Sequence, residues 1–517
     1  MAKIRYNPVT IEILWTRLVG IVDEAAATFE RTSFSSLVRE SNDYSLVLTD
    51  AKGRSLAQNT IAIPSFIGTL PATVRHFLKH FPLETLKPGD VMITNDPWLG
   101  SGHLPDVNTA MPIFRHGKPI AFAAADSHVA DIGGRPLVAG NRELFDEGIR
   151  LTPRKLMEGG RVNHSLVEFI ESNVRTPQLT MGDIWGQVSA CRMIEKRLLE
   201  MLDESGASVD RLGRHIHERS ERAMRAAIRE IPNGVYEFET IDDGFDDTPM
   251  VVHCRVEVGD DDVAVDYAGS SPQLPLAVNV VPAYAFAWSA FTLKSMLSPE
   301  LPNNEGAFKP IRTSAPEGSI FNPRFPAACN ARHAVGHLIP PAIMGALAPA
   351  VPDKVLAAPG SPLCTLTLTG EHQGRPFSSM SFITAGVGAS SRRDGISMLT
   401  FPTNVSNMPL EVLETDVPIR VFRRQLRMGS GGGGAHRGGD GGVFEFEIVG
   451  EAPMMMALMK NRLKHPAMGL LGGEAGRLGV LKINGRDYDA VEPVLVRKGD
   501  RILIKTAGGG GFGVPGT

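Results

Sequence analysis

Two spacings of apolar residues divide this 517-residue chain into two parts. In the first part they recur every three or four positions over residues 183–202 and 208–231, which predicts two helices. Beyond the turn-forming sequence Pro232-Asn233-Gly234 they alternate in short runs between Asp- and Gly-rich turns, which predicts β-strands. We therefore predict two domains, residues 1–231 and 232–517, of which the second is rich in strands.

The first predicted domain mixes helices with strands. Asn7 followed by Pro8 is typical of a helix start, and apolar residues continue at helical spacing as far as Phe29. Two strands joined by a hairpin are predicted within residues 44–63, followed by a helix over 70–81. The predicted fold class is therefore α/β, in the mixed α+β sense: a large multi-layer body with an N-terminal α/β region and a β-rich C-terminal region.

Charge and composition exclude several classes of partner. The chain has 53 basic and 57 acidic residues, so there is no basic excess to bind nucleic acid or an anionic membrane. The longest apolar run, residues 338–351, is too short to cross a bilayer and contains three prolines. The four cysteines are far apart and form no CxxC pair, and the N-terminus resembles no signal or transit peptide. We therefore expect a cytoplasmic protein.

Two His-x-x-Asp units follow two predicted apolar strands, VMITNDP and IAFAAADSH. The units are His103-Leu-Pro-Asp106 and His128-Val-Ala-Asp131. Imidazoles and carboxylates are ligands for zinc, manganese or iron, so the units predict a metal site. Pro105 excludes a continuous helix through the first unit, so its ligands are expected to project from a loop. The alternative is a pair of hydrogen-bonded structural histidines.

Three further aspartates stand near these strands. Asp43 lies just before a predicted strand and either completes the ligand set or forms a turn. Asp96 precedes Pro97, where a side chain that stabilises a turn is favoured over a metal ligand. Asp126 is either a metal ligand or a residue that stabilises a turn.

Two glycine-rich segments, residues 429–442 and 508–513, raise the question of phosphate binding, because backbone N–H groups of glycine loops can surround anions. Neither segment continues into Gly-Lys-Ser/Thr, and neither matches GxGxxG between a strand and a helix. We therefore expect tight turns or a mobile lid rather than a nucleotide site.

Other candidate reactive side chains have ordinary structural explanations. Cys329 stands close to His333, but burial in the core is favoured over a nucleophilic role. Four arginines in loop-like surroundings could bind a carboxylate or phosphate with two hydrogen bonds, although solvated surface charge is the more common outcome. These arginines are Arg39, Arg135, Arg332 and Arg392.

The sequence resembles the hydantoinase B/oxoprolinase family along nearly its whole length. This family includes the B subunits of ATP-dependent hydantoinases and the corresponding subunits of acetone and acetophenone carboxylases. The resemblance is carried, in order, by NPVTIEILWTRLVGIVDEAAATFERTSFS, RESNDYS, GDVMITNDPWLGSGHLPDV, DSHVADIGG, ELFDEGIRLTP, NVRTPQLTMGDIWGQ, LPNNEGAFKPI, APEGSIFNPRFPAA and GGGGFGVPG.

The resemblance implies a metal-bearing subunit that works with a hydantoinase A-type subunit, which binds ATP. It implies that Asp43, His103, Asp106 and His128 bind the divalent metal, and that Asp131 is a catalytic base or a further ligand. The implied activity is hydrolytic opening of a cyclic amide (hydantoin, oxoproline or lactam) after ATP-dependent activation, in a hetero-oligomer. Two alternatives stay open: a component of an acetone- or acetophenone-type carboxylase, and a non-catalytic scaffold for the A-type subunit.

Overall fold

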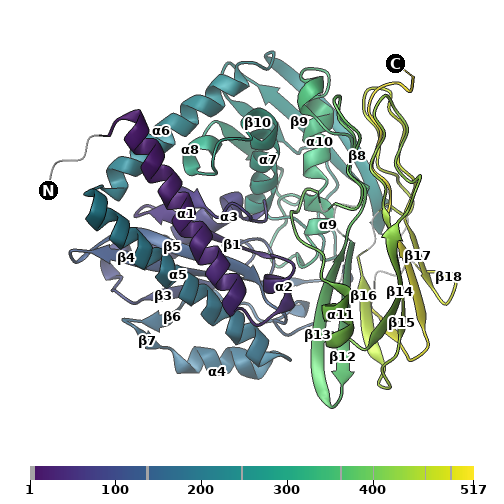
Figure 1. Cartoon of the computed structure of the whole chain (residues 1–517), viewed down its shortest axis with the longest axis horizontal. Coiled ribbons are helices and arrows are strands. Elements are labelled where there is room, and N and C mark those ends of the chain that lie inside the picture. Colours follow the sequence, from purple (N-terminus) through teal and green to yellow (C-terminus); the bar gives the residue numbers. More distant parts are fainter. Residues whose placement is uncertain are drawn as a thin grey trace.

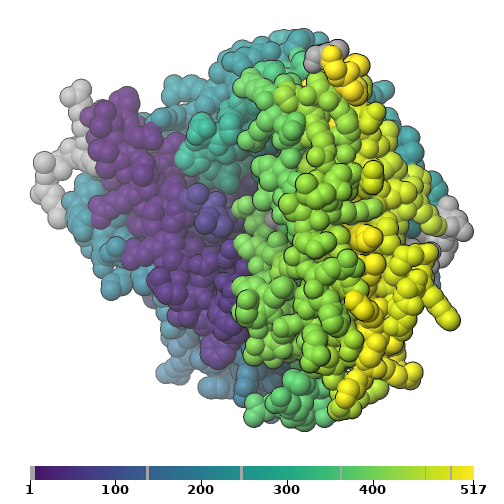
Figure 2. All heavy atoms as spheres, turned by 45° about the vertical axis from the view of Figure 1, so that its right-hand side comes forward, coloured from purple at the N-terminus to yellow at the C-terminus, as the bar shows by residue number. Residues whose placement is uncertain are grey.

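The protein is described by a computed structural model over residues 6–135, 139–245, 248–360, 364–399, 401–459, 462–488 and 492–516. Helices account for 31% of the chain and strands for 28%, in several sheets, which confirms the predicted mixed α/β class. Figure 1 shows most helices and the first sheet on one side of the molecule and the C-terminal strands on the other, with the short helix α11 (Leu410–Asp416) among them. In Figure 2 the C-terminal strands, green to yellow, lie directly against the N-terminal region in purple.

A seven-stranded antiparallel sheet forms the centre of the N-terminal region, in the order β2-β1-β5-β4-β3-β6-β7. Its strands are β1 (Tyr44–Asp50), β2 (Ser55–Gln58), β3 (Val91–Thr94), β4 (Asp106–Arg115), β5 (Lys118–His128), β6 (Arg154–Glu158) and β7 (Arg161–Val162). Both faces of its central strands are buried, one against α1 and α5 and the other against α3. This double burial explains why β1 and the end of β5 are continuously apolar or buried rather than alternating.

The first helix begins where the sequence predicts it, whereas the helix predicted over 70–81 begins at Phe66 and the helix predicted over 183–202 begins at Pro177. The Asn7 side chain accepts a hydrogen bond of 2.8 Å from the backbone N–H of Thr10, which caps α1 and confirms the predicted start. The α-helices are α1 (Pro8–Thr32), α2 (Ser36–Arg39), α3 (Phe66–His80), α4 (His164–Asn173), α5 (Pro177–Ser205), α6 (Val209–Ile228), α7 (Pro282–Leu297), α8 (Glu305–Phe308), α9 (His333–Gly336), α10 (Ile339–Leu347) and α11 (Leu410–Asp416). Short 3₁₀ turns are η1 (Leu83–Thr85), η2 (Leu144–Asp146) and η3 (Pro352–Lys354).

A second sheet, in the order β11-β10-β9-β8, follows the predicted turn at Pro232-Asn233-Gly234. Its strands are β8 (Gly234–Phe245), β9 (Thr248–Val258), β10 (Val263–Asp266) and β11 (Ile311–Ser314). It packs against α7 and α10, the latter containing most of the apolar run 338–351. None of the helices within the described ranges combines the length and apolarity needed to cross a membrane.

Two further sheets form the C-terminal layers and share one apolar core, as in a β-sandwich. The third sheet contains β12 (Cys364–His372), β13 (Arg375–Ile383), β16 (Met454–Leu458) and β19 (Val494–Val496). The fourth contains β14 (Ile419–Leu426), β15 (Gly442–Ile448), β17 (Val480–Ile483), β18 (Arg486–Asp487) and β20 (Arg501–Lys505). The division into domains at residue 231 stays a prediction.

The two glycine-rich segments lie against each other beside these sheets. The N–H of Gly432 donates to Gly509 O at 2.9 Å, and the N–H of Gly509 donates to Gly439 O at 3.0 Å. A Cβ atom at Gly438 would lie 2.0 Å from Gly509 O, so only glycine permits this approach of two backbones. Close packing of backbone on backbone therefore accounts for the composition of both segments.

Candidate metal centre

Three neighbouring strands bring the predicted ligands together. Asp106 is the first residue of β4 and His128 the last of β5, and the two are direct partners in the antiparallel register. The backbone N–H of His128 donates to Asp43 O at 3.1 Å, which places Asp43, the residue just before the adjoining strand β1, next to His128. Two carboxylates and one imidazole therefore lie together at one end of these central strands. His103 lies beside them on the loop before β4.

The two histidines and Asp106 form a buried cluster. Asp106 Oδ1 lies 2.6 Å from His103 Nε2 and 3.2 Å from His128 Nδ1. One ligand atom from each of the three residues lies within 4.8 Å of the other two. A His-Asp-His set of this kind could hold a metal ion.

The protonation of His103 supplies the test of whether a cation fits. Its Nδ1 lies 2.7 Å from Asn330 O, and because a carbonyl only accepts, Nδ1 carries the proton. Burial and the charge of Arg332 lower the pKa of His103 to about 4, so the ring is neutral at pH 7 and its Nε2 is a lone pair. That lone pair faces the carboxylate oxygen of Asp106 at 2.6 Å. With Nδ1 held as the donor to Asn330 O, Nε2 is the ring atom available to a cation beside Asp106 and His128, so the donor set fits a divalent metal.

Charge is concentrated on Asp106. Burial acts to raise the pKa of its carboxyl, but the neighbouring groups, with the charge of Arg332 among them, hold that pKa well below its usual range, which favours an ionised carboxylate. Asp43 lines the same cavity but falls outside the set of ligand atoms that lie within 4.8 Å of one another. Burial, together with the charge of Asp106, raises the pKa of Asp43 to about 6.

Arg332 holds the second oxygen of Asp106. Its Nη2 donates to Asp106 Oδ2 at 2.6 Å, its Nε donates to Ser101 O at 2.8 Å, and its guanidinium lies 4.2 Å from the centre of the Tyr284 ring. Only 3% of Arg332 is exposed, so for this arginine the expectation of a solvated surface charge is wrong. The other three arginines singled out above form ion pairs at the surface: Arg39 with Glu40, Arg135 with Glu492 and Arg392 with Asp353.

Sequence reasoning missed several residues that enclose the cavity, which has a volume of about 50 Å³. His333 and His337 line it from α9 and its C-terminal end, and burial lowers the pKa of both, that of His337 to about 3. The C-terminal region closes it with Thr365, Met380, Phe382, Thr403 and Val405. The site thus draws on both sides of the predicted domain boundary, whereas the sequence placed it in residues 1–231 alone.

The surroundings of the remaining candidates, Asp96, Asp126 and Cys329, favour a structural role over a catalytic one. Asp96 accepts hydrogen bonds from the N–H of Trp98 at 3.1 Å and from Arg150 at 2.8 Å, as expected of a residue that stabilises a turn. Burial and the nearby Asp106 raise the pKa of Asp126 well above its usual range, which favours an uncharged carboxyl. Cys329 is buried, and burial raises the pKa of its thiol well above the usual range, which disfavours a thiolate nucleophile.

Asp131 lies outside the His-Asp-His cluster. Its Oδ1 accepts a hydrogen bond of 2.6 Å from Arg175, and its Oδ2 accepts one from the backbone N–H of the same residue. It lines a smaller neighbouring cavity that His128 also borders, together with Glu147 and Asn330. The role of Asp131 as a base stays a prediction.

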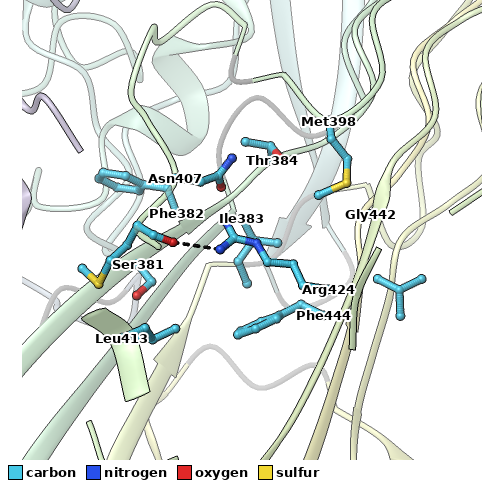
Figure 3. Close-up of a pocket in the computed structure, with 12 residues that line it drawn as sticks. Ser381, Phe382, Ile383, Thr384, Met398, Asn407, Leu413, Arg424, Gly442 and Phe444 are labelled. Carbon is cyan, nitrogen blue, oxygen red and sulfur yellow. Dashed lines mark hydrogen bonds between the residues drawn. The ribbon is translucent and has the colours of Figure 1, made fainter. Parts of the chain in front are cut away.

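A further small cavity lies on the other side of β13, within the C-terminal layers (Figure 3). Arg424 reaches into it and donates a hydrogen bond of 2.8 Å to Met408 O. Phe382 borders both this cavity and the metal cavity, and it packs in a cluster with Phe66 and Val405. The Phe382 ring is therefore part of the wall between them.

Removing this ring should destabilise the fold measurably. Because Phe382 is buried, we expect Phe382→Ala to lower the free energy of unfolding by about 3–5 kcal/mol, as for other buried phenylalanines. Urea unfolding of the full chain measures the change, with the half-exposed Phe169→Ala as a control expected within about 0.5 kcal/mol of the unaltered chain. Equal stability of the two variants would show that Phe382 is no structural wall.

Comparison with known proteins supports the resemblance. The sequence model of the family described as hydantoinase B/oxoprolinase matches residues 7–515. A protein of Pseudomonas sp. (strain NS671), provisionally named as the B subunit of a D-/L-hydantoinase, is 28% identical over 99% of this chain and 90% of its own length. The chain is 27% identical to 5-oxoprolinase 1 of Arabidopsis thaliana over 98% of its length, but it spans only 42% of that protein.

Two solved structures share the fold. The ATP-dependent caprolactamase of Pseudomonas jessenii superposes with a TM-score of 0.91 at 24% identity, covering 99% of this chain and 92% of the other. Acetone carboxylase in its nucleotide-free form superposes with a TM-score of 0.88 at 21% identity, covering 98% and 76%. With the family model matching almost from end to end, the chain belongs to the hydantoinase B/oxoprolinase family.

Proposed function

We propose that this chain is the metal-binding component of an ATP-dependent amidohydrolase that opens a cyclic amide such as a hydantoin, oxoproline or a lactam. The observation that carries the proposal is the buried cluster in which His103 Nε2 and His128 Nδ1 lie 2.6 Å and 3.2 Å from Asp106 Oδ1. The relatives named as a hydantoinase component and as 5-oxoprolinase support the choice of substrate class.

The need for ATP follows from the chemistry of the substrate. Resonance makes the carbonyl carbon of a cyclic amide a poor electrophile, and phosphorylation of the amide oxygen yields an activated imidate that water can attack. We propose that His103, Asp106 and His128, with Asp43 as a further ligand, hold zinc, manganese or iron. A metal ion held there would act as a Lewis acid and, if it is zinc, would lower the pKa of a bound water from 15.7 to about 7.

The chain's own residues would orient the metal ligands and accept a proton from the attacking water. Asn330 O keeps the proton of His103 on Nδ1, and Arg332 holds one oxygen of Asp106 away from the cluster. We keep Asp131 as a candidate base. Asp43 is a second candidate, because a carboxylate with a pKa of about 6 inside the cavity is suited to accept a proton near neutral pH.

Asp131→Asn and Asp43→Asn separate these roles. If Asp131 is the base, its Asn variant should keep the metal and lose about 10²–10⁴-fold in kcat. If Asp43 is a ligand, Asp43→Asn should lose the metal, whereas if Asp43 is the base it should keep the metal and lose kcat. Metal content and kcat of the assembled complex are measured for both variants. An unchanged kcat for Asp131→Asn would limit Asp131 to its bonds with Arg175.

We also propose that ATP is bound by a separate partner of the hydantoinase A type. The sequence of this chain contains neither Gly-Lys-Ser/Thr nor GxGxxG in a strand–helix setting, and it spans only 42% of a single-chain 5-oxoprolinase. The Pseudomonas relative is itself named as one of several subunits, which supports a hetero-oligomer.

The function is tested on the complex purified with its A-type partner. ATP turnover is measured with hydantoin, oxoproline or a lactam present, and stimulation by at least one cyclic amide is expected. Absence of stimulation by any of them would count against the proposal. Bicarbonate-dependent consumption of a ketone without amide hydrolysis would indicate the carboxylase alternative instead.

A further inference from the structure

One short loop, residues 329–332, contacts His103 and Asp106 at the atoms that do not face the cluster. The carbonyl of Asn330 accepts the Nδ1 proton of His103 at 2.7 Å, and Arg332 donates to Asp106 Oδ2 at 2.6 Å. The loop therefore determines which nitrogen of His103, and which oxygen of Asp106, is left for a cation. Its own position must then be fixed for the site to keep its shape.

Glu147 is the side chain that fixes the backbone of this loop. It follows η2 and is completely buried. Its Oε1 accepts hydrogen bonds from the N–H of Cys329 at 2.9 Å and from the N–H of Asn330 at 2.6 Å. A continuous path thus leads from the Glu147 carboxyl through the backbone of Asn330 to the imidazole of His103.

We propose that Glu147 is a positioning residue for the metal centre, which holds the loop 329–332 so that His103 and Asp106 present their ligand atoms together. The inference deepens the proposed function and depends on the metal site within it. Glu147 acts on the ligand side chains only through the loop, as outer partners of metal ligands do in many proteins.

The chemistry of the contact predicts which substitutions preserve it. Oε1 of Glu147 accepts both N–H bonds, and burial raises the pKa of this carboxyl well above its usual range, which favours the uncharged form. Glutamine has the same length, no charge and one acceptor oxygen, so Glu147→Gln should keep both bonds. Glu147→Ala leaves two buried N–H groups without an acceptor, which releases the loop. Glu147→Asp is one methylene shorter and should lose the contact while remaining polar.

The experiment measures the affinity of the full chain for Zn²⁺ alone, by competition with a chelator. We expect Glu147→Ala and Glu147→Asp to bind Zn²⁺ about 10–100-fold more weakly than the unaltered chain, and Glu147→Gln to bind it within about threefold. The visible spectrum of the Co²⁺-loaded chain is a second readout, expected to change in the Ala and Asp variants and to be retained in Glu147→Gln.

Asp183 provides a matched control. Like Glu147 it is buried, and its Oδ1 accepts two consecutive backbone N–H groups, those of Phe34 at 2.8 Å and Ser35 at 3.1 Å. It lies on α5, and these bonds tie it to the segment after α1 rather than to the loop 329–332. Asp183→Ala should therefore lower thermal stability as Glu147→Ala does, yet bind Zn²⁺ as tightly as the unaltered chain.

Each outcome has a defined meaning. If the unaltered chain binds Zn²⁺ and Glu147→Ala or Glu147→Asp binds it equally tightly, the inference about Glu147 is wrong and the proposed function stands. A matching loss of affinity in Asp183→Ala would also overturn the inference, because it would trace the effect to general destabilisation. If the unaltered chain binds none of Zn²⁺, Mn²⁺ and Fe²⁺, the proposed function fails as well. Should Glu147→Ala not fold, Glu147→Asp and Glu147→Gln decide.

Discussion

His103→Ala and His128→Ala should each abolish stoichiometric binding of a divalent metal by the purified chain. Loss of an outer partner of a metal ligand typically costs 10–100-fold in affinity, and loss of a ligand from a three-residue set should cost more than that. Elemental analysis after gel filtration and chelator competition measure the change. In the assembled complex we expect ATP turnover to lose its stimulation by a cyclic amide.

His253→Ala is the matched control for this experiment. His253 also directs its Nδ1 to a backbone carbonyl, that of Ala268 at 2.8 Å, but it lies on β9, away from the cluster. Its variant should keep the metal and the activity. Full activity of a His103→Ala, His128→Ala double variant in an intact complex would instead support a non-catalytic scaffold in which the histidines are structural.

Arg332→Ala should strongly destabilise the chain. Arg332 and Asp106 form a buried ion pair at 2.6 Å, and removal of one partner leaves an uncompensated charge. Such a loss costs about 3–5 kcal/mol of unfolding free energy. Because a divalent cation beside Asp106 would replace part of the missing positive charge, added Zn²⁺ should restore some of the stability. Chemical denaturation with and without Zn²⁺ measures both effects.

The surface pair of Arg392 and Asp353 gives the comparison. The two side chains are 3.0 Å apart but largely exposed, so Arg392→Ala should change the free energy of unfolding by no more than about 1 kcal/mol. If Arg332→Ala costs no more than Arg392→Ala, then Arg332 does not compensate Asp106, and the arrangement of charge described above is wrong.

Local features of the fold could be predicted from the sequence because their causes are local. The cap of α1 depends on Asn7 and Pro8 alone. Asp106 and His128 pair because β4 and β5 are consecutive strands of one hairpin. The predicted second strand of the first hairpin ends earlier than expected, at Gln58, and the apolar Ile63 packs instead in a separate cluster with Phe382.

The rest of the site depends on contacts between distant parts of the chain. Arg332 lies 226 positions after Asp106, and nothing in its loop distinguishes it by sequence from the exposed Arg392. Glu147 looks like any other acid in a turn, because its two acceptor bonds are to backbone groups 182 and 183 positions away. Backbone donors leave no trace in side-chain patterns, so such partners become visible only with coordinates.

The dispersal of the cavity wall along the chain has a consequence for synthesis. The ribosome has already made His103, Asp106 and His128 once the strands of the first sheet have been synthesised. Arg332, which pairs with Asp106, and strand β13, which covers the site, are made much later. Until those segments emerge, the nascent chain lacks the side chains that cover the three residues in the complete fold. A metal ion bound at that stage would occupy a site that is not yet covered. Stable retention of the ion would therefore begin only when the later segments have folded over the site.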